Sequence, residues 1–139
     1  MSFLIDTNVI SEAERPRPDQ HVLSWIRNQD EPRLYLSAVS IGEIKKGAER
    51  LDSAQKKAHI LTWLEEVRSR FSGRILSLSE ETFLVWGRLY ADLQRRGIVR
   101  PSFDSLLEAT ALEHDLILVT RNVRNFQGSS ATILNPWES

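Results

Sequence analysis

The chain has 139 residues and a formal net charge of -1, a length that predicts one domain with one hydrophobic core. Hydrophobic residues make up 41% and charged residues 27%, a composition typical of soluble globular proteins. Cysteine is absent, which excludes disulfides and thiolate metal sites and favours a reducing cytoplasm. No apolar stretch is long enough to span a bilayer, and the charge gives no global attraction to nucleic acid.

Short apolar runs alternate with longer amphipathic stretches along the chain. The runs predict strands at residues 3–6, 34–36, 75–76, 116–120 and 131–134. The stretches predict helices at about residues 8–13, from Asp19, at 39–51, from Asp52 or Ser53, from Ser79 to Gly97, and after Pro101. Prolines 16 and 18 predict a loop before Asp19, and Gly73 marks a helix end.

This alternation predicts an α/β fold with a mostly parallel sheet of about four to five strands, flanked by helices. We expect a single domain over residues 1–139, because no repeat or interdomain linker is present. In such sheets ligands bind beyond the carboxyl ends of the strands. Asp6 and the segment 120–122 follow strands, while Glu43 and Asp104 lie near helix N-termini that can face the same edge.

Each of these three acids has a structural explanation when it is taken alone. Asp6 could satisfy backbone donors in the turn after the first strand. Glu43 follows Ser40 by three residues and could form a capping box with it. Asp104 stands in a first helical turn, where the helix dipole favours a carboxylate. Their joint occurrence at one predicted edge is what favours a site.

Three converging carboxylates constrain the chemistry of such a site. They repel one another unless a cation neutralises them or one is protonated. Oxygen ligands without Cys or paired His favour Mg²⁺ or Mn²⁺ over zinc, and two such ions about 3.5–4 Å apart can promote phosphodiester hydrolysis. His21, His59 and His114 are scattered and show no ligand spacing.

A series of different, uncommon short segments lies along the chain from one end to the other. They are residues 3–12, 34–39, 42–44, Gly47, 71–76, Asp104 with 109–111, 118–122, and the ending Asn135-Pro136-Trp137. In type and order these segments resemble the PIN-domain ribonucleases, specifically the VapC and FitB-like toxins of type II toxin–antitoxin pairs.

The resemblance implies a three-layer PIN-like fold in which Asp6, Glu43 and Asp104 bind Mg²⁺ or Mn²⁺ and cut RNA. Thr7 matches a hydroxyl residue able to hydrogen-bond the first carboxylate or a metal-bound water. It also implies an endoribonuclease toxin that forms a homodimer and is held inactive by a cognate antitoxin in a higher assembly. The antitoxin's tail would enter the site and its other end would bind operator DNA. We therefore expect a cytoplasmic protein with an RNA substrate and no membrane partner.

The chain departs from that family at the position of a fourth acid, where Asn122 and Asn125 stand. Asparagine offers a carbonyl ligand without charge, so a second metal should be held more weakly. We expect Asn122 or Asn125 to orient a metal-bound water. Glu108 lies four residues after Asp104 on the same helical face and is a candidate auxiliary residue of the metal site. A solvated helix position is an equally weighted alternative explanation of this residue.

Basic residues gather in several runs, which are usually solvated faces. Arg100 and Arg121 lie nearest the acids in sequence, and we expect them to contact RNA phosphates. A non-catalytic PIN-like module that binds RNA or a partner, with weakened metal binding, is the alternative function; the three retained acids favour the enzyme. An aspartate phosphatase would need a second Asp where Asn8 stands.

Overall fold

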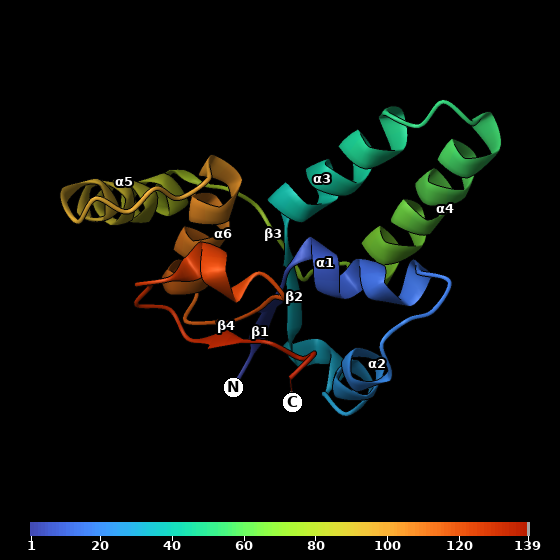
Figure 1. Ribbon diagram of the computed structural model, residues 1–139, viewed down its shortest axis with the longest axis horizontal. Helices are drawn as coiled ribbons and strands as arrows, with labels where there is room; N and C mark the ends of the chain where they lie inside the picture. Colours follow the sequence, from blue (N-terminus) through green and yellow to red (C-terminus); the bar gives the residue numbers. More distant parts are fainter. Residues whose placement is uncertain (139) are drawn as a thin grey trace.

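In the computed structural model, which describes residues 1–138, a five-stranded parallel sheet lies between two layers of helices (Figure 1). The strands lie in the order β3-β2-β1-β4-β5. Their bounds are β1 (Phe3–Ile5), β2 (Leu34–Ser37), β3 (Ile75–Leu76), β4 (Ile117–Val119) and β5 (Ile133–Leu134). Every neighbouring pair is parallel, so the predicted α/β fold and its sheet are confirmed.

The helices also follow the predicted order. They are α1 (Thr7–Ile10), α2 (Gln20–Arg27), α3 (Ala38–Glu49), α4 (Ala54–Arg70), α5 (Glu80–Arg95) and α6 (Ser102–Glu113), with short 3-10 turns η1 (Ser11–Glu14), η2 (Glu31–Arg33) and η3 (Val123–Phe126). The helix predicted at residues 8–13 is split between α1 and η1. Asp19, Ser53 and Ser79 cap α2, α4 and α5 as expected. None of the helices described is long and apolar enough to cross a membrane.

The central strand β1 is buried on both faces, because its side chains alternate between two hydrophobic clusters. Phe3 and Ile5 pack with residues of α1, α2 and α4 on one face. Leu4 packs with residues of α6 on the other, and α5 lies against α6 on its outer side (Figure 1). The chain therefore forms the three layers expected from the resemblance.

Helix α3 begins without a connecting loop at the carboxyl end of β2. Ser37 ends the strand, and its hydroxyl caps the helix by accepting a hydrogen bond from the Val39 N–H at 3.0 Å. The proposed capping box between Ser40 and Glu43 is therefore wrong. The Ser40 hydroxyl is buried and has no hydrogen-bond partner among the residues described, while Glu43 lies in the second turn. Contacts of α3 with α1 and α6 bring Glu43 toward the other acids.

Candidate active site

Asp6 directly follows β1 and is 7% exposed. Its Oδ1 accepts a hydrogen bond from the Thr7 N–H at 2.7 Å, which is the local cap that we considered as its alternative role. Its Oδ2 accepts from the Thr120 hydroxyl at 2.8 Å and from the Asn8 side-chain amide at 3.4 Å. Thr120 directly follows β4, the neighbour of β1 in the sheet. Donors from two adjacent strand ends therefore fix both carboxylate oxygens.

Thr7 links the first acid to the second. Its backbone N–H binds Asp6, and its hydroxyl donates to Glu43 Oε1 at 3.0 Å across 36 residues of sequence. The resemblance implied that this hydroxyl could bind the Asp6 carboxylate or a metal-bound water; of the two neighbouring carboxylates, it binds Glu43 and not Asp6. Thr7 thus fixes the distance between the end of β1 and helix α3.

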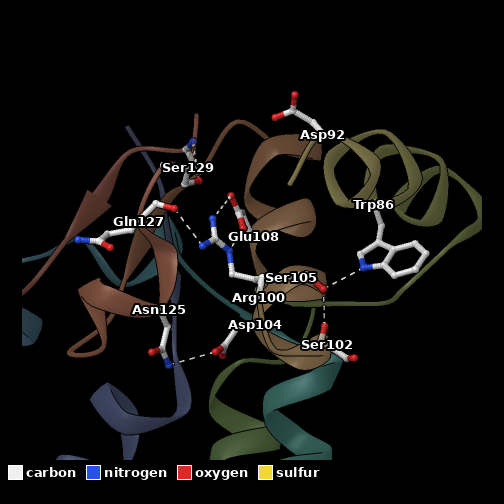
Figure 2. Close-up of polar contacts among 12 residues, drawn as sticks. Trp86, Asp92, Arg100, Ser102, Asp104, Ser105, Glu108, Asn125, Gln127 and Ser129 are labelled. Carbon is white, nitrogen blue, oxygen red and sulfur yellow. Dashed lines mark hydrogen bonds and ion pairs between the residues drawn. The ribbon is translucent and has the colours of Figure 1, made fainter. Parts of the chain in front are cut away.

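Asp104 lies in the first turn of α6, and its partner comes from the turn η3 after β4. Asn125 donates from Nδ2 to Asp104 Oδ2 at 3.1 Å, a contact visible in Figure 2. Asn125 is one of the two residues at the position of the fourth acid. The other, Asn122, takes part through its backbone, whose N–H donates to the Thr120 hydroxyl at 3.0 Å.

The three acids lie close enough to affect one another's ionisation. Burial is the largest influence and raises the pKa of each carboxyl group. The bonds from Thr120, Thr7 and Asn8 only partly offset it for Asp6. The negative charge of Asp6 further raises the pKa of Glu43 and of Asp104, and Asp104 also acts on Glu43. All three pairs therefore repel, and the acids, distant in sequence, meet at the carboxyl edge of the sheet.

Arg100 and Glu108 do not lie where the sequence placed them. Glu108 is fully buried rather than solvated, and both of its oxygens bind Arg100, at 2.8 Å from Nε and 3.3 Å from Nη2. Arg100 is 3% exposed. The prediction that Arg100 contacts RNA phosphates is therefore wrong for this conformation, because its guanidinium is enclosed by the protein.

Arg121 is exposed, as an RNA contact requires. Its guanidinium carbon lies 5.1 Å from the ring centre of Trp137, so the side chain is held by a cation–π contact. Together with Asn122, Arg124 and Asn125, Arg121 lines a surface hollow. Glu138 also lines this hollow, and Asn125 links it to the acidic site through its bond to Asp104.

Two further residues of the site were not singled out from the sequence. Thr120 is fully buried and donates to Asp6. Asn8 donates to Asp6 and accepts, through Oδ1, from the Arg121 N–H at 3.2 Å. The available signal was their position: both are polar residues at the carboxyl ends of adjacent strands, where side chains from separate strands meet.

The donor chemistry of the site suits a hard divalent cation. Its donors are carboxylate and amide oxygens, and its three negative charges repel one another, a cost that a cation offsets. Within residues 1–138, no group of three or more His, Cys, Asp or Glu side chains has the geometry of a metal site as it stands. Asp6, Glu43 and Asp104 fit Mg²⁺ or Mn²⁺ by charge and ligand type.

Comparison with known proteins agrees with the fold. A family model described as the PIN domain matches residues 3–127. The toxin FitB of Neisseria gonorrhoeae is 32% identical over 136 residues, which is 97% of this chain and 98% of FitB. The VapC ribonuclease Y4jK of Sinorhizobium fredii is 33% identical over 137 residues, 98% of each chain.

Solved structures extend this similarity to three dimensions. The crystal structure of FitAcB from Neisseria gonorrhoeae contains a chain that matches with a TM-score of 0.93 and 31% identity, over 99% of both chains. The structure of FitAB bound to the IR36 DNA fragment matches with a TM-score of 0.91 and 30% identity, over 97% of this chain and 95% of that one. The chain therefore belongs to the PIN-domain family and shares the length and fold of its VapC and FitB-like toxins.

Proposed function

We propose that this protein is a metal-dependent endoribonuclease, the toxin of a toxin–antitoxin pair, which cleaves RNA phosphodiesters with Mg²⁺ or Mn²⁺. The observation that carries the proposal is the meeting of Asp6, Glu43 and Asp104 at one sheet edge, each with a raised pKa and each repelled by the others. Groups arranged at such a cost to stability are typical of functional sites.

The residues of the chain divide the work of such a site between them. Asp6, Glu43 and Asp104 would hold the cation, which when bound supplies charge neutralisation and activation of water for attack on the phosphate. Thr120 and Asn8 fix the oxygens of Asp6, and Thr7 fixes Glu43. Asn125 holds Asp104 by an amide rather than adding a fourth negative charge.

The RNA backbone would approach through the hollow that Arg121 and Arg124 line beside Asn125. Local positive charge matters here because the chain as a whole carries a net charge of -1. Arg121 takes the role that we first gave to both Arg100 and Arg121, since Arg100 is buried.

The toxin role is supported by the relatives. FitB is named a toxin, and the matched solved structures include FitAcB and FitAB bound to a DNA fragment. In keeping with the family resemblance, we propose that the chain forms a homodimer and assembles with an antitoxin that binds operator DNA. We place the activity in the cytoplasm, in keeping with a chain that contains no cysteine.

The test is cleavage by purified protein free of antitoxin. Single-stranded and structured RNA should be degraded in Mg²⁺ or Mn²⁺, and EDTA should stop the reaction. Asp6→Asn should abolish cleavage. Glu12→Gln is the control and should keep it: Glu12 is also buried, at 4% exposure, but its carboxylate accepts a hydrogen bond from the Asp19 N–H outside the site. A metal-loaded protein that binds RNA without cutting it would favour the non-catalytic module instead.

A further inference from the structure

A fully enclosed ion pair lies next to the acidic site and takes no part in the function proposed so far. Arg100 and Glu108 have side chains that are 1% and 0% exposed. The guanidinium binds Glu108 with two donors, and a third donor, Nη1, binds the Gln127 carbonyl at 3.0 Å. Figure 2 shows Arg100 between these two partners, with Asp104 and Asn125 close by.

This pair joins the segments that carry Asp104 and Asn125. Arg100 stands just before α6, and Glu108 lies one turn beyond Asp104 on the same helix. Gln127 directly follows η3, which contains Asn125. Arg100 also lies against the ring of Phe126, with its guanidinium carbon 5.8 Å from the ring centre. The guanidinium therefore connects α6 to the end of η3, and the Asn125–Asp104 bond spans the same gap.

The start of α6 depends on such outside contacts. Its N-cap residue is Pro101, which makes no side-chain cap hydrogen bond. Trp86 of α5 donates to the Ser105 hydroxyl at 2.9 Å, and Ser105 donates to the Ser102 carbonyl at 2.7 Å. These bonds hold one side of the first turn, and the Arg100–Glu108 pair holds the side that faces η3 (Figure 2).

Stability alone does not explain an ion pair in this place. Removing two charges from water costs about as much as their attraction returns, and well-packed apolar residues are often equally stable or more so. What a buried guanidinium provides is direction, because its planar fork fixes several acceptors at once. Here those acceptors are one side chain on α6 and one backbone carbonyl after η3.

We propose that Arg100 and Glu108 are positioning residues that dock η3 on α6 and thereby hold Asn125 against Asp104 in the geometry that binds the cation. The inference rests on the proposed function, since it concerns the same acidic site. Neither residue touches the cation or RNA; both act through Asp104 and Asn125.

The test is the double variant Arg100→Met with Glu108→Leu, which replaces the pair by apolar side chains and leaves no lone buried charge. Two measurements report on the site without RNA: Mn²⁺ affinity by isothermal titration, and the NMR signal of the Asn125 side-chain amide. We expect the variant to remain folded, the Mn²⁺ dissociation constant to rise about tenfold or more, and the amide signal to move. Loss of such supporting contacts typically weakens metal binding by about 10–100-fold.

Arg74→Met is the matched control, because Arg74 also binds backbone carbonyls, of Glu31, Leu34 and Arg70, but lies before β3 at the opposite sheet edge. It should lose stability and keep wild-type Mn²⁺ affinity. A folded double variant with wild-type affinity and an unmoved amide signal overturns the proposal. If the double variant does not fold, Arg100→Lys is measured in its place, because lysine keeps the positive charge but lacks the planar guanidinium. The same outcomes apply: wild-type Mn²⁺ affinity with an unmoved Asn125 amide signal overturns the proposal.

The design separates this inference from the function on which it rests. A wild-type protein that binds Mn²⁺ but cuts no RNA refutes the nuclease and leaves the Mn²⁺ comparison valid. A wild-type protein that binds no Mn²⁺ refutes the metal site, and the Asn125 amide signal alone then decides whether the pair positions that residue.

Discussion

Replacing Thr120 with valine removes one hydroxyl and little else, since the two side chains have the same shape. The hydroxyl donates to Asp6 at 2.8 Å and accepts from the Asn122 N–H at 3.0 Å and from the Asn8 side-chain amide at 3.4 Å, in a fully buried position. A hydrogen bond to a charged group contributes about 1.5–3 kcal/mol. Because Asp6 keeps its bonds to Thr7 and Asn8, we expect a loss of about 2 kcal/mol, or roughly 7 °C in melting temperature for a chain of this size.

The pH dependence of this loss identifies Asp6 as its cause. The bond from Thr120 lowers the pKa of Asp6, so the variant raises further a pKa that burial has already raised. At a pH above the folded-state pKa of Asp6 in both the wild type and the variant, the carboxylate is ionised in both proteins, and the full loss of stability is present. As the pH falls through the raised pKa toward the ordinary value of 3.8, protonation relieves the loss and the two stabilities converge.

The assay is urea unfolding across this pH range in EDTA, with Thr110→Val as the control. Thr110 is as deeply buried, but its hydroxyl donates to the neutral Leu106 carbonyl at 2.8 Å within α6. Its loss should be about 1 kcal/mol or less and should not change with pH. Equal, pH-independent losses for the two variants would refute the role given to Thr120.

Three other predictions concern charge at the site. Asp104→Asn removes one of three repelling carboxylates, so in EDTA its melting temperature should exceed that of wild type; a lower value contradicts the repulsion. Mg²⁺ at a hundred times its dissociation constant should stabilise the wild type by about 2.7 kcal/mol and should not stabilise Asp6→Asn; equal stabilisation would place the ion elsewhere. Arg121→Ala should reduce the slope of log affinity for RNA against log salt by about 0.7–0.9, measured by fluorescence anisotropy, whereas an unchanged slope removes Arg121 from the RNA path.

The parts of the structure that follow from local pattern were predictable. Apolar runs gave the strands, and Asp19, Ser53 and Ser79 gave three helix starts, because a cap needs only a side chain and the donors next to it. The convergence of Asp6 and Asp104 followed from a general rule of parallel sheets. The start of α3 was predicted to within one residue, but its cap was assigned to Ser40 in place of Ser37, because β2 passes into the helix at Ser37 with no turn residue to mark the change.

The environment of Arg100 and Glu108 could not be read from spacing. Periodicity places Glu108 on the face of Asp104, yet it does not say whether solvent, metal or another side chain covers that face. The answer depends on the path of the segment before α6 and on the docking of η3, which are tertiary features. The same holds for Asn125: its place in the chain suggested a ligand, while its bond to Asp104 depends on how two separate segments meet.

Both edge strands of the sheet, β3 and β5, are only two residues long. A short edge offers few unpaired backbone groups, so another chain can gain little by adding a strand there. Recognition by β-augmentation, in which a peptide extends a partner's sheet, is therefore poorly suited to this molecule. A binding protein would then rely on helix faces, loops and side chains, and its specificity would depend on the shape of those surfaces.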